Sequence, residues 1–173
     1  VFIADKDGDD KPDAKAEVLL DGWSIKDRHE TLNSFIWGPD GWLYGCHGVF
    51  NSSKVGKPGD SAAQRQPIDG GVWRFHPVTK KFEVVVRGLS NPWGFDFNSV
   101  GDGFTTGCVI PHLFHIIQGG VYDKQGRHYI DKYYYDDIQT IRDHKHASAH
   151  GGARFYLGGA FPEKYNDQLF MCN

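Results

Sequence analysis

Aspartate residues at alternate positions near the start of the chain predict a site for a hard cation. The stretch 5–13 has the sequence D-K-D-G-D-D-K-P-D and follows the pattern D-x-D-G-D-x-x-x-D. The patterned carboxylates belong to Asp5, Asp7, Asp9 and Asp13. Alternate carboxylates in a tight loop converge on one centre, Gly8 permits the sharp turn, and such oxygen ligands suit Ca²⁺. The bidentate glutamate of an EF-hand would fall on Ala16, so we expect a shorter, structural calcium loop. The alternative is a solvated acidic turn.

Histidine residues are the second group that could do chemistry. His29 lies beside Glu30 in D-R-H-E, just before the first hairpin that the sequence predicts. Further along, His144, His146 and His150 form the pattern H-x-H-x-x-x-H. Imidazoles at alternate positions of a strand share a face and suit a transition metal, but they equally suit a polar substrate or cofactor cleft. The pattern alone leaves both readings open.

An amide and a large ring flank a rigid turn at Asn91-Pro92-Trp93-Gly94, which makes Asn91 and Trp93 candidate binding residues. The three cysteines lie far apart, with no C-x-x-C pair, at Cys46, Cys108 and Cys172. This spacing excludes zinc-finger and c-type haem patterns within the stretch. We expect buried, unreactive thiols, with one disulfide and a leftover thiol as the alternative.

These residues need a scaffold, and the composition predicts an all-β one. Among 173 residues there are 22 glycines and one methionine, and aromatic residues make up 14%. Turn formers and flat side chains without helix formers favour strands. The formal net charge of −3 supplies no basic surface for nucleic acid or for an anionic membrane. No apolar run reaches the roughly 20 residues of a membrane span, so any membrane contact would need segments outside this chain.

Four hairpins are predicted from turn residues between aromatic and β-branched runs. Their strands are expected at residues 35–37 and 42–45, 72–75 and 82–86, 93–97 and 104–109, and 153–157 and 168–171. The turns near Asp40, Asp102 and Asp167 recur about every 60 residues. Short antiparallel strands with recurring turns predict a β-propeller, at roughly 40–50 residues per blade. The chain would then be a single partial propeller domain, residues 1–173, of about three blades; a complete β-sandwich is the alternative.

The ends and the long connections carry further expectations. Residues 1–4 and 169–173 have the pattern of strands cut from a longer sheet, so we expect the chain to be a fragment of a longer protein. Residues 51–69 are polar and poor in strand formers, which predicts a surface loop. Residues 111–150 hold six of the nine histidines, and loops of that length are often functional.

The order of these motifs resembles a known superfamily. D-R-H-E-T-L-N-S-F-I-W-G-P-D-G-W-L-Y-G is followed by D-G-G-V-W-R-F-H-P, R-G-L-S-N-P-W-G-F-D-F and F-Y-L-G-G-A-F-P-E-K-Y-N-D-Q-L-F. This order resembles the six-bladed propellers of the soluble quinoprotein glucose/sorbosone dehydrogenases. It is most similar to the membrane-bound dehydrogenase domains of planctomycetes, in which a haem-c domain often follows. The acidic loop before the GPDG segment is also typical of that group.

The resemblance implies a dehydrogenase with pyrroloquinoline quinone (PQQ) as cofactor and a sugar or polyol as substrate. A histidine shortly before the GPDG turn would be the general base, and His29 is the nearest candidate, although Glu30 occupies the expected position. In the family's G-x-R-N-P-x-G motif, Asn91 matches the asparagine that holds the quinone, and Ser90 replaces the arginine. With Asn91, the residues Trp93, His144, His146 and His150 would line the cofactor pocket.

Two other functions remain open from the residues. One is a non-catalytic, Ca²⁺-stabilised propeller that binds carbohydrate or protein or serves as a structural module, which the scaffold motifs and the missing arginine favour. The other is a lactonase-type hydrolase with a central Ca²⁺ held by Asn33, Asn91 and Asp96. On the dehydrogenase reading, electrons leave to a haem-c domain or a cytochrome. A calcium loop favours a periplasmic or extracellular location, because Ca²⁺ is abundant there.

Overall fold

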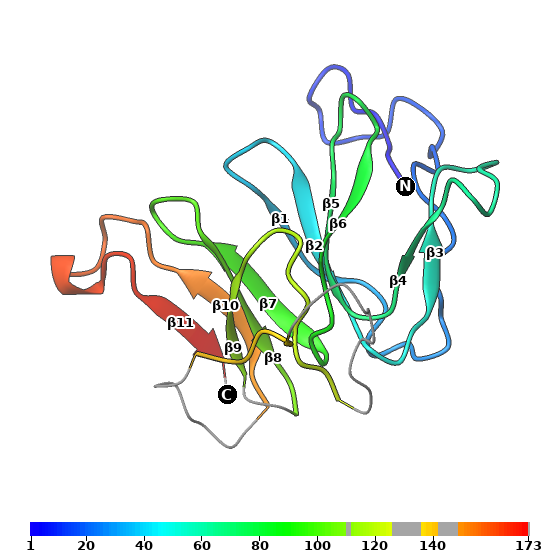
Figure 1. Cartoon of the computed structure of the whole chain (residues 1–173). Coiled ribbons are helices and arrows are strands. Elements are labelled where there is room, and N and C mark those ends of the chain that lie inside the picture. Colours follow the sequence, from blue (N-terminus) through cyan, green and yellow to red (C-terminus); the bar gives the residue numbers. More distant parts are fainter. Residues whose placement is uncertain (110–111, 126–135, 142–148, 173) are drawn as a thin grey trace.

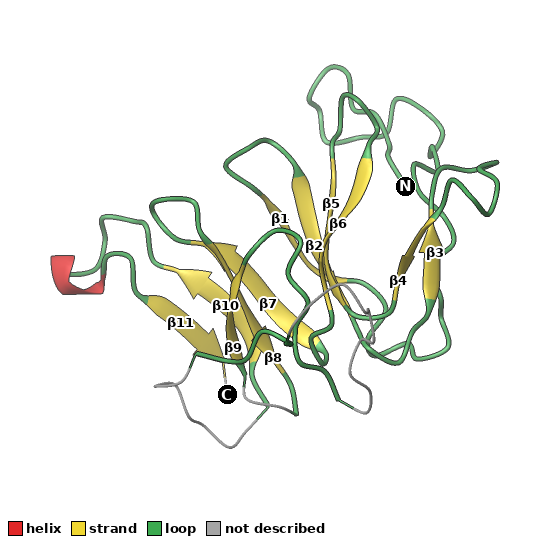
Figure 2. Cartoon of the chain, in the orientation of Figure 1, coloured by secondary structure: helices red, strands yellow, loops and turns green. Residues whose placement is uncertain are grey.

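The computed structural model describes residues 1–109, 112–125, 136–141 and 149–172. In this part of the chain the strands form four antiparallel sheets, and the only helical segment is the 3-10 turn η1 (Glu163–Tyr165). Figure 2 shows strands and loops, with η1 in red. The all-β fold is therefore confirmed.

The first sheet has four strands in the order β1-β2-β5-β6. Their bounds are β1 (Asn33–Trp37), β2 (Leu43–His47), β5 (Gly71–Phe75) and β6 (Phe82–Arg87). The GPDG turn joins β1 to β2 as predicted: Asp40 Oδ1 accepts a hydrogen bond from Trp42 N at 3.3 Å, and Gly41 has φ of 79°. A positive φ of this size favours glycine because it has no Cβ.

Two smaller sheets follow along the chain. One has the order β7-β8-β9, with β7 (Pro92–Phe97), β8 (Gly103–Gly107) and β9 (Leu113–Ile116), and the other pairs β10 (Gly151–Phe155) with β11 (Leu169–Cys172). All four predicted hairpins are thus present, with ends displaced by one or two residues. Such displacements are common because strand ends fray and turns fix only the centre of a hairpin.

The predicted surface loop at residues 51–69 is partly wrong, because it contains a two-stranded sheet, β3 (Ser53–Val55) and β4 (Gln66–Ile68). Val55 and Ile68 are buried and pack with Trp73, Phe75 and Phe82 in one of two apolar clusters. Two buried aliphatic residues in a polar stretch suffice for a short hairpin when an apolar face of another sheet covers them.

The strand expected at residues 1–4 is also wrong: it is reduced to one isolated bridge between Phe2 and Glu17. Of the three cysteines only Cys46 is fully buried, Cys108 is half-buried and Cys172 is exposed, so the expectation of buried thiols holds only for Cys46. All three cysteines are free, so the alternative prediction of one disulfide is wrong.

The first strands of three sheets lie side by side and run in the same direction. β7 is next to β10, where Asp96 Oδ2 accepts a hydrogen bond from Phe155 N at 2.8 Å. β1 adjoins β7 on the other side, and residues of all three strands enclose a hollow of about 140 Å³. Figure 1 shows β1, β7 and β10 next to one another.

Apolar side chains fill the space between the first sheet and the β7-β8-β9 sheet. The buried cluster comprises Tyr44, Cys46, Val72, Val85, Val86, Leu89, Phe95, Phe114 and Tyr122. The outer turns of neighbouring sheets are also tied, because Ser99 donates from N and Oγ to the Asp167 carboxylate at 2.8 and 2.6 Å. In the part of the chain that the structure describes, no helix is long and apolar enough to cross a membrane.

The contact between β7 and β10 predicts the outcome of one substitution. A Cβ at Gly94 would lie 2.4 Å from Ala153 N and 2.5 Å from Gly152 C. We expect Gly94→Ala to push these strands apart and to lower the free energy of unfolding by about 1–3 kcal/mol, measured as the midpoint of urea unfolding. Gly151→Ala is the control, because its Cβ would meet nothing within 4 Å. Equal midpoints for the two variants would contradict this packing.

Candidate functional site

Three of the predicted site residues stand just before the first strands of three sheets. Glu30 precedes β1 by three residues, Asn91 directly precedes β7, and His150 directly precedes β10. Because β1, β7 and β10 are adjacent and parallel, their beginnings lie at one end of the molecule. The fold therefore gathers residues that are 120 positions apart in the sequence, from Glu30 to His150.

Cys108, which follows β8, links these residues. Its backbone N donates a hydrogen bond to Asn91 O at 3.1 Å, and its Sγ lies 3.5 Å from His150 O. Burial raises the pKa of the Cys108 thiol, and the negative charge of Glu30 raises that pKa further. Cys108 is thus the common neighbour of Glu30, Asn91 and His150. The sequence had indicated only an unreactive thiol, since nothing in its spacing points to these partners.

Each of the three first strands has an irregular register near its beginning. Shifts lie between Asn33 and Ile36 in β1, between Pro92 and Phe95 in β7, and between Gly151 and Ala153 in β10. β-bulges bend a strand and redirect side chains, and they are frequent next to active sites. At this end of the sheets, the three register shifts therefore interrupt the regular pairing of the strands and redirect their backbones.

Glu30 is a buried carboxylate, with 5% of the residue exposed. Its Oε2 accepts a hydrogen bond from Phe50 N at 2.9 Å, and its carbonyl oxygen accepts one from Gly48 N at 2.8 Å. Within the described part of the chain, no group donates a hydrogen bond to Glu30 Oε1. One oxygen therefore anchors the carboxylate and the other can accept a proton or a ligand's hydroxyl group, since a buried carboxylate needs such partners.

Asn91 has a left-handed backbone with φ of 44°, a conformation that asparagine tolerates better than most residues. Its Oδ1 is buried and has no hydrogen-bond partner in the described part of the chain. A buried amide oxygen without a partner is uncommon and marks either strain or an absent ligand or water. The preceding Ser90 is fully buried, and its Oγ accepts a hydrogen bond from Gln125 N.

His150 is buried and stacks on the buried ring of His112, with centroids 4.2 Å apart and planes 14° from parallel. The His112 carbonyl oxygen accepts a hydrogen bond from Gly107 N at 2.9 Å, which holds His112 at the end of β8. The pairing of His112 with His150 was not predicted, because 38 positions separate them in the sequence.

The other predicted residues lie differently. The His29 side chain is 95% exposed, and its Nδ1 lies 3.3 Å from Asp27 Oδ1. The structure does not bring the His29 ring to Glu30, Asn91 or His150. Trp93, 37% exposed, lies on β7. His144 and His146 are outside the described residues.

The hydrolase alternative places a central Ca²⁺ on Asn33, Asn91 and Asp96, and two of these residues, Asn33 and Asp96, already have polar partners within the chain. Asp96 accepts hydrogen bonds from Phe97 N at 2.9 Å and from Phe155 N at 2.8 Å, and it lies 3.7 Å from the Arg154 guanidinium. Asn33 Oδ1 accepts from Ser34 Oγ at 2.7 Å. Asp96 thus joins β7 to β10 and forms an ion pair with the Arg154 side chain.

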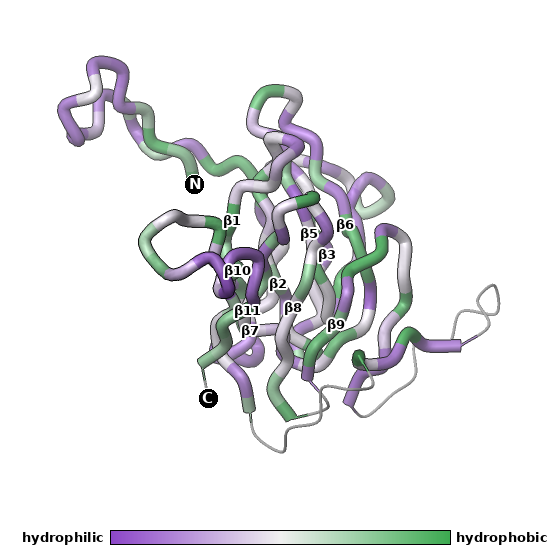
Figure 3. The backbone as a smooth tube through the Cα atoms, turned by 90° about the vertical axis from the view of Figure 1, so that its left-hand side faces the viewer, coloured by the Kyte–Doolittle hydropathy of each residue, from purple (hydrophilic) through white to green (hydrophobic). Residues whose placement is uncertain are grey.

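The acidic loop brings three of its four patterned carboxylates together. Ligand atoms of Asp5, Asp7 and Asp13 lie within 4.8 Å of one another, and all three residues are exposed. Asp9 does not belong to this group, and its Oδ2 lies 2.8 Å from Lys11 Nζ. Asp5 accepts hydrogen bonds from the N–H groups of Gly8 and Asp10. This hydrophilic loop stands apart from the sheets in Figure 3. Its carboxylate oxygens are the type of ligand that hard cations such as Ca²⁺ prefer.

The family model described as Domain of unknown function (DUF7133) matches residues 1–173 of the chain. No curated protein and no solved structure matches it.

The position of Cys108 predicts how a change at Glu30 alters the thiol. Because the Glu30 charge raises the Cys108 pKa, Glu30→Gln should lower that pKa and increase the rate of Cys108 alkylation by iodoacetamide near neutral pH. Peptide-resolved mass spectrometry gives this rate. Glu163→Gln, a substitution in the exposed turn η1, should leave it unchanged.

Alkylation of the buried Cys46 reports unfolding in the same experiment. The electrostatic link between Glu30 and Cys108 would be contradicted if Cys108 were alkylated at the same rate in Glu30→Gln as in the wild-type protein. It would also be contradicted if the alkylation rate of Cys46 rose in parallel.

Proposed function

Starting from the fact that the chain belongs to the DUF7133 family, we propose that it is part of a six-bladed β-propeller dehydrogenase of the quinoprotein type. The proposed reaction is oxidation of a sugar or polyol at the end of the sheets that carries Glu30, Asn91 and His150. We propose electron transfer to a haem-c domain or a cytochrome, and a periplasmic or extracellular location.

The arrangement of the sheets supports the propeller. Propeller blades are small antiparallel sheets whose first strands surround a common axis and whose later strands lie progressively outward. Here the strands of each sheet follow chain order, as in β1-β2-β5-β6 and β7-β8-β9, and β1, β7 and β10 are neighbours. On this reading the chain contributes about three blades, and the hairpin of β3 and β4 is an insertion between strands of the first.

The observation that carries the proposed activity is the convergence of Glu30, Asn91 and His150 at one end of β1, β7 and β10. These residues come from three separate motifs, and each was a candidate for catalysis or cofactor binding from the sequence. A carboxylate, an amide and an imidazole at the mouth of a propeller axis are the groups with which a protein binds hydroxyl and carbonyl oxygens.

The residues present fit a quinone. The buried Asn91 Oδ1 without a partner belongs to an amide that a ligand would satisfy, and rotation of this amide offers either an acceptor or a donor. Asn91 and His150 would hold the quinone, with Trp93 on the adjoining strand. A bound quinone would supply the two-electron acceptor for this oxidation, in which the carbon-bound hydrogen leaves the alcohol as a hydride, the hydroxyl group loses its proton and a carbonyl compound is formed.

Glu30 would accept the hydroxyl proton of the substrate at Oε1. Its other oxygen is held by Phe50 N, so the carboxylate keeps one orientation. A general base needs reach to the proton and a suitable pKa rather than an imidazole. The exposed His29 is the alternative base, and variants of the two residues distinguish them.

A second candidate function is a propeller that binds carbohydrate without oxidising it. The observation that favours it is Ser90, which lies where the resemblance expects an arginine. Ser90 is neutral and fully buried, and its hydroxyl group is occupied by Gln125 N. An anionic quinone would then lack a cation at this position.

The test is reconstitution of the intact protein with PQQ and Ca²⁺, followed by dye reduction with a panel of sugars and polyols. We expect a change in quinone absorbance on binding and dye reduction with at least one substrate. Glu30→Gln should lower kcat by about 10²–10⁴-fold, and Asn91→Ala should weaken quinone binding by about tenfold. Glu163→Gln is the matched control.

Loss of activity in His29→Gln with full activity in Glu30→Gln would move the base to His29. Sugar binding with no absorbance change of the quinone would support the second candidate and exclude the dehydrogenase.

We also propose that Asp5, Asp7 and Asp13 bind a structural Ca²⁺. Three converging carboxylates support this assignment. Trypsin can cut the loop after Lys6, so Ca²⁺ should slow this cleavage and EGTA should restore it, as followed by mass spectrometry. Asp5→Asn should abolish the protection, whereas Asp9→Asn should keep it because the Asp9 carboxylate pairs with Lys11. Cleavage that ignores Ca²⁺ would contradict the proposal.

A further inference from the structure

Trp37 and Phe170 are exposed aromatic residues on the two sheets that flank the β7-β8-β9 sheet. Trp37 ends β1 and is 60% exposed, and Phe170 of β11 is 45% exposed. Both β1 and β10 contact β7, so the first sheet and the β10-β11 sheet lie on either side of it (Figure 1). A single exposed aromatic residue needs no explanation, but these two hold positions at which the chain elsewhere joins its sheets.

The three hairpins β1-β2, β7-β8 and β10-β11 align by their strand pairs. The aligned pairs are Ile36 with Tyr44, Asp96 with Phe104, and Arg154 with Phe170. The second-strand residue of each pair is aromatic, and so is the residue that follows the first-strand member. The second-strand aromatics are therefore Tyr44, Phe104 and Phe170, and the first-strand aromatics are Trp37, Phe97 and Phe155.

Contacts between neighbouring sheets use one residue of each kind. The Phe97 ring lies against Tyr44 of the preceding sheet, with centroids 5.1 Å apart and planes at 77°. The Phe155 ring lies against Phe104 of its preceding sheet, with centroids 5.3 Å apart and planes at 58°. Tilted and edge-to-face aromatic pairs at this spacing are favourable beyond the area that they bury. The chain thus makes the same contact twice: a first-strand aromatic packs on the second-strand aromatic of the sheet before it.

Within the described residues, Trp37 and Phe170 are the two members of this set without such a contact to another sheet. By its position, Trp37 would pack on a sheet that precedes the first one. By its position, Phe170 would receive a sheet that follows β10 and β11. Each end of the row therefore presents the half of the contact that the other end lacks.

Phe35 enlarges the aromatic surface beside Trp37. It lies two positions earlier on β1 and therefore on the same face of the sheet, and it is also exposed. Its equivalent on β7 is Phe95, whose ring stacks on Tyr44 with centroids 5.5 Å apart. Tyr44 is thus held by two aromatic residues of the following sheet. Phe35 and Trp37 offer the same two side chains to the ring of a partner.

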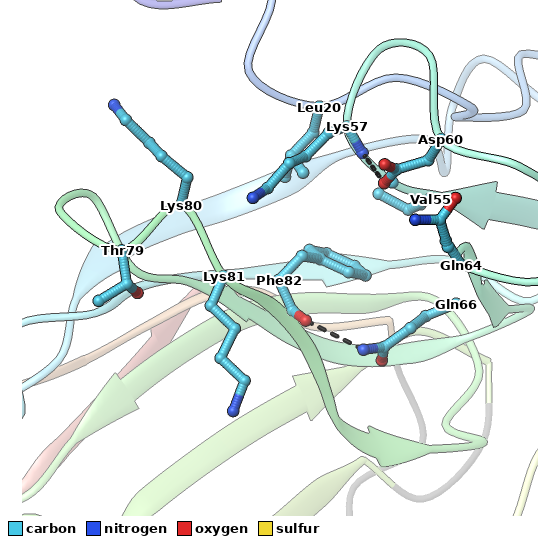
Figure 4. A pocket seen from close by; sticks show the side chains of 11 residues that line it. Leu20, Val55, Lys57, Asp60, Gln64, Gln66, Thr79, Lys80, Lys81 and Phe82 are labelled. Carbon is cyan, nitrogen blue, oxygen red and sulfur yellow. Dashed lines mark hydrogen bonds between the residues drawn. The ribbon is translucent and has the colours of Figure 1, made fainter.

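Only the β1 end of this face is open to a partner. The hairpin of β3 and β4 and residues 19–23 cover the face at β5 and β6, where they pack on the cluster that contains Trp73 and Phe82. Figure 4 shows Leu20, Val55 and Phe82 in this covered region, where the loop between β3 and β4 faces the turn between β5 and β6. The open end is the first strand, which is also the strand that makes the contacts within the chain.

We propose that a second copy of the chain is the partner, with Phe170 of one copy packed on Trp37 of the other. A second copy carries both halves of the contact, and its first sheet would follow the β10-β11 sheet as that sheet follows β7-β8-β9. Two copies make two such head-to-tail contacts and together supply six sheets, within the roughly 4–8 blades with which propellers close. Head-to-tail contacts form a ring when the rotation closes and a filament when it does not. The proposal depends on this packing alone and is independent of the dehydrogenase proposal.

Sedimentation equilibrium of the chain over a range of concentrations tests the proposal. We expect a dimer at about 100 µM that dissociates on dilution. Trp37→Lys and Phe170→Glu each place a charge in both contacts of the ring and should weaken dimer formation by at least about tenfold. Val78→Lys is the control, because Val78 is the more exposed apolar residue of the β5-β6 turn and takes no part in the contact. It should change the dissociation constant by less than about twofold.

An equal mixture of Trp37→Lys and Phe170→Glu tests the direction of the contact and the folding of both variants. One copy keeps Phe170 and the other keeps Trp37, so one aromatic contact is intact, and the two new charges are opposite at the second contact. A heterodimer should therefore form at concentrations where neither variant dimerises alone. A monomeric chain at about 100 µM, an unchanged dimer in both variants, or no heterodimer in the mixture would overturn the proposal. Growth of the unmodified chain beyond the dimer would overturn the closed ring.

Discussion

The contact between adjacent first strands is the constraint on which the rest of the structure depends. β7 approaches β10 so closely that Gly94 has no room for a Cβ against Gly152 and Ala153. Asp96 holds the same two strands by its hydrogen bond to Phe155 N. A close parallel approach of β1, β7 and β10 places the beginnings of three sheets at one end, and the candidate residues follow from that placement.

The polar groups at this end illustrate how one buried carboxylate serves both structure and chemistry. Glu30 fastens the chain at residues 48–50 through its carbonyl oxygen and Oε2. The same carboxylate raises the pKa of Cys108, which also contacts Asn91 and His150. Packing and electrostatics therefore couple three loops that belong to three sheets.

Local chemistry accounts for the parts of the fold that were predicted correctly. The hairpin of β1 and β2 followed from Pro39, Asp40 and Gly41, whose preferences act within four residues. The hairpin of β3 and β4 was missed because Val55 and Ile68 gain their burial from the distant Trp73. In the candidate site, the types and positions of Glu30, Asn91 and His150 were visible in the sequence, whereas Cys108 and His112 carry no local signal.

The sequence by itself determined the all-β fold, the hairpins and the residue types that could bind a cation or a polar ligand, because turn and strand preferences and ligand chemistry are local properties. Only the tertiary structure decided which of those residues meet. It separated Asp9 from Asp5, Asp7 and Asp13, and it left His29 in solvent while burying Glu30. It also placed the loop between β3 and β4 opposite the turn between β5 and β6, since the contact of two distant loops depends on packing that no short stretch encodes.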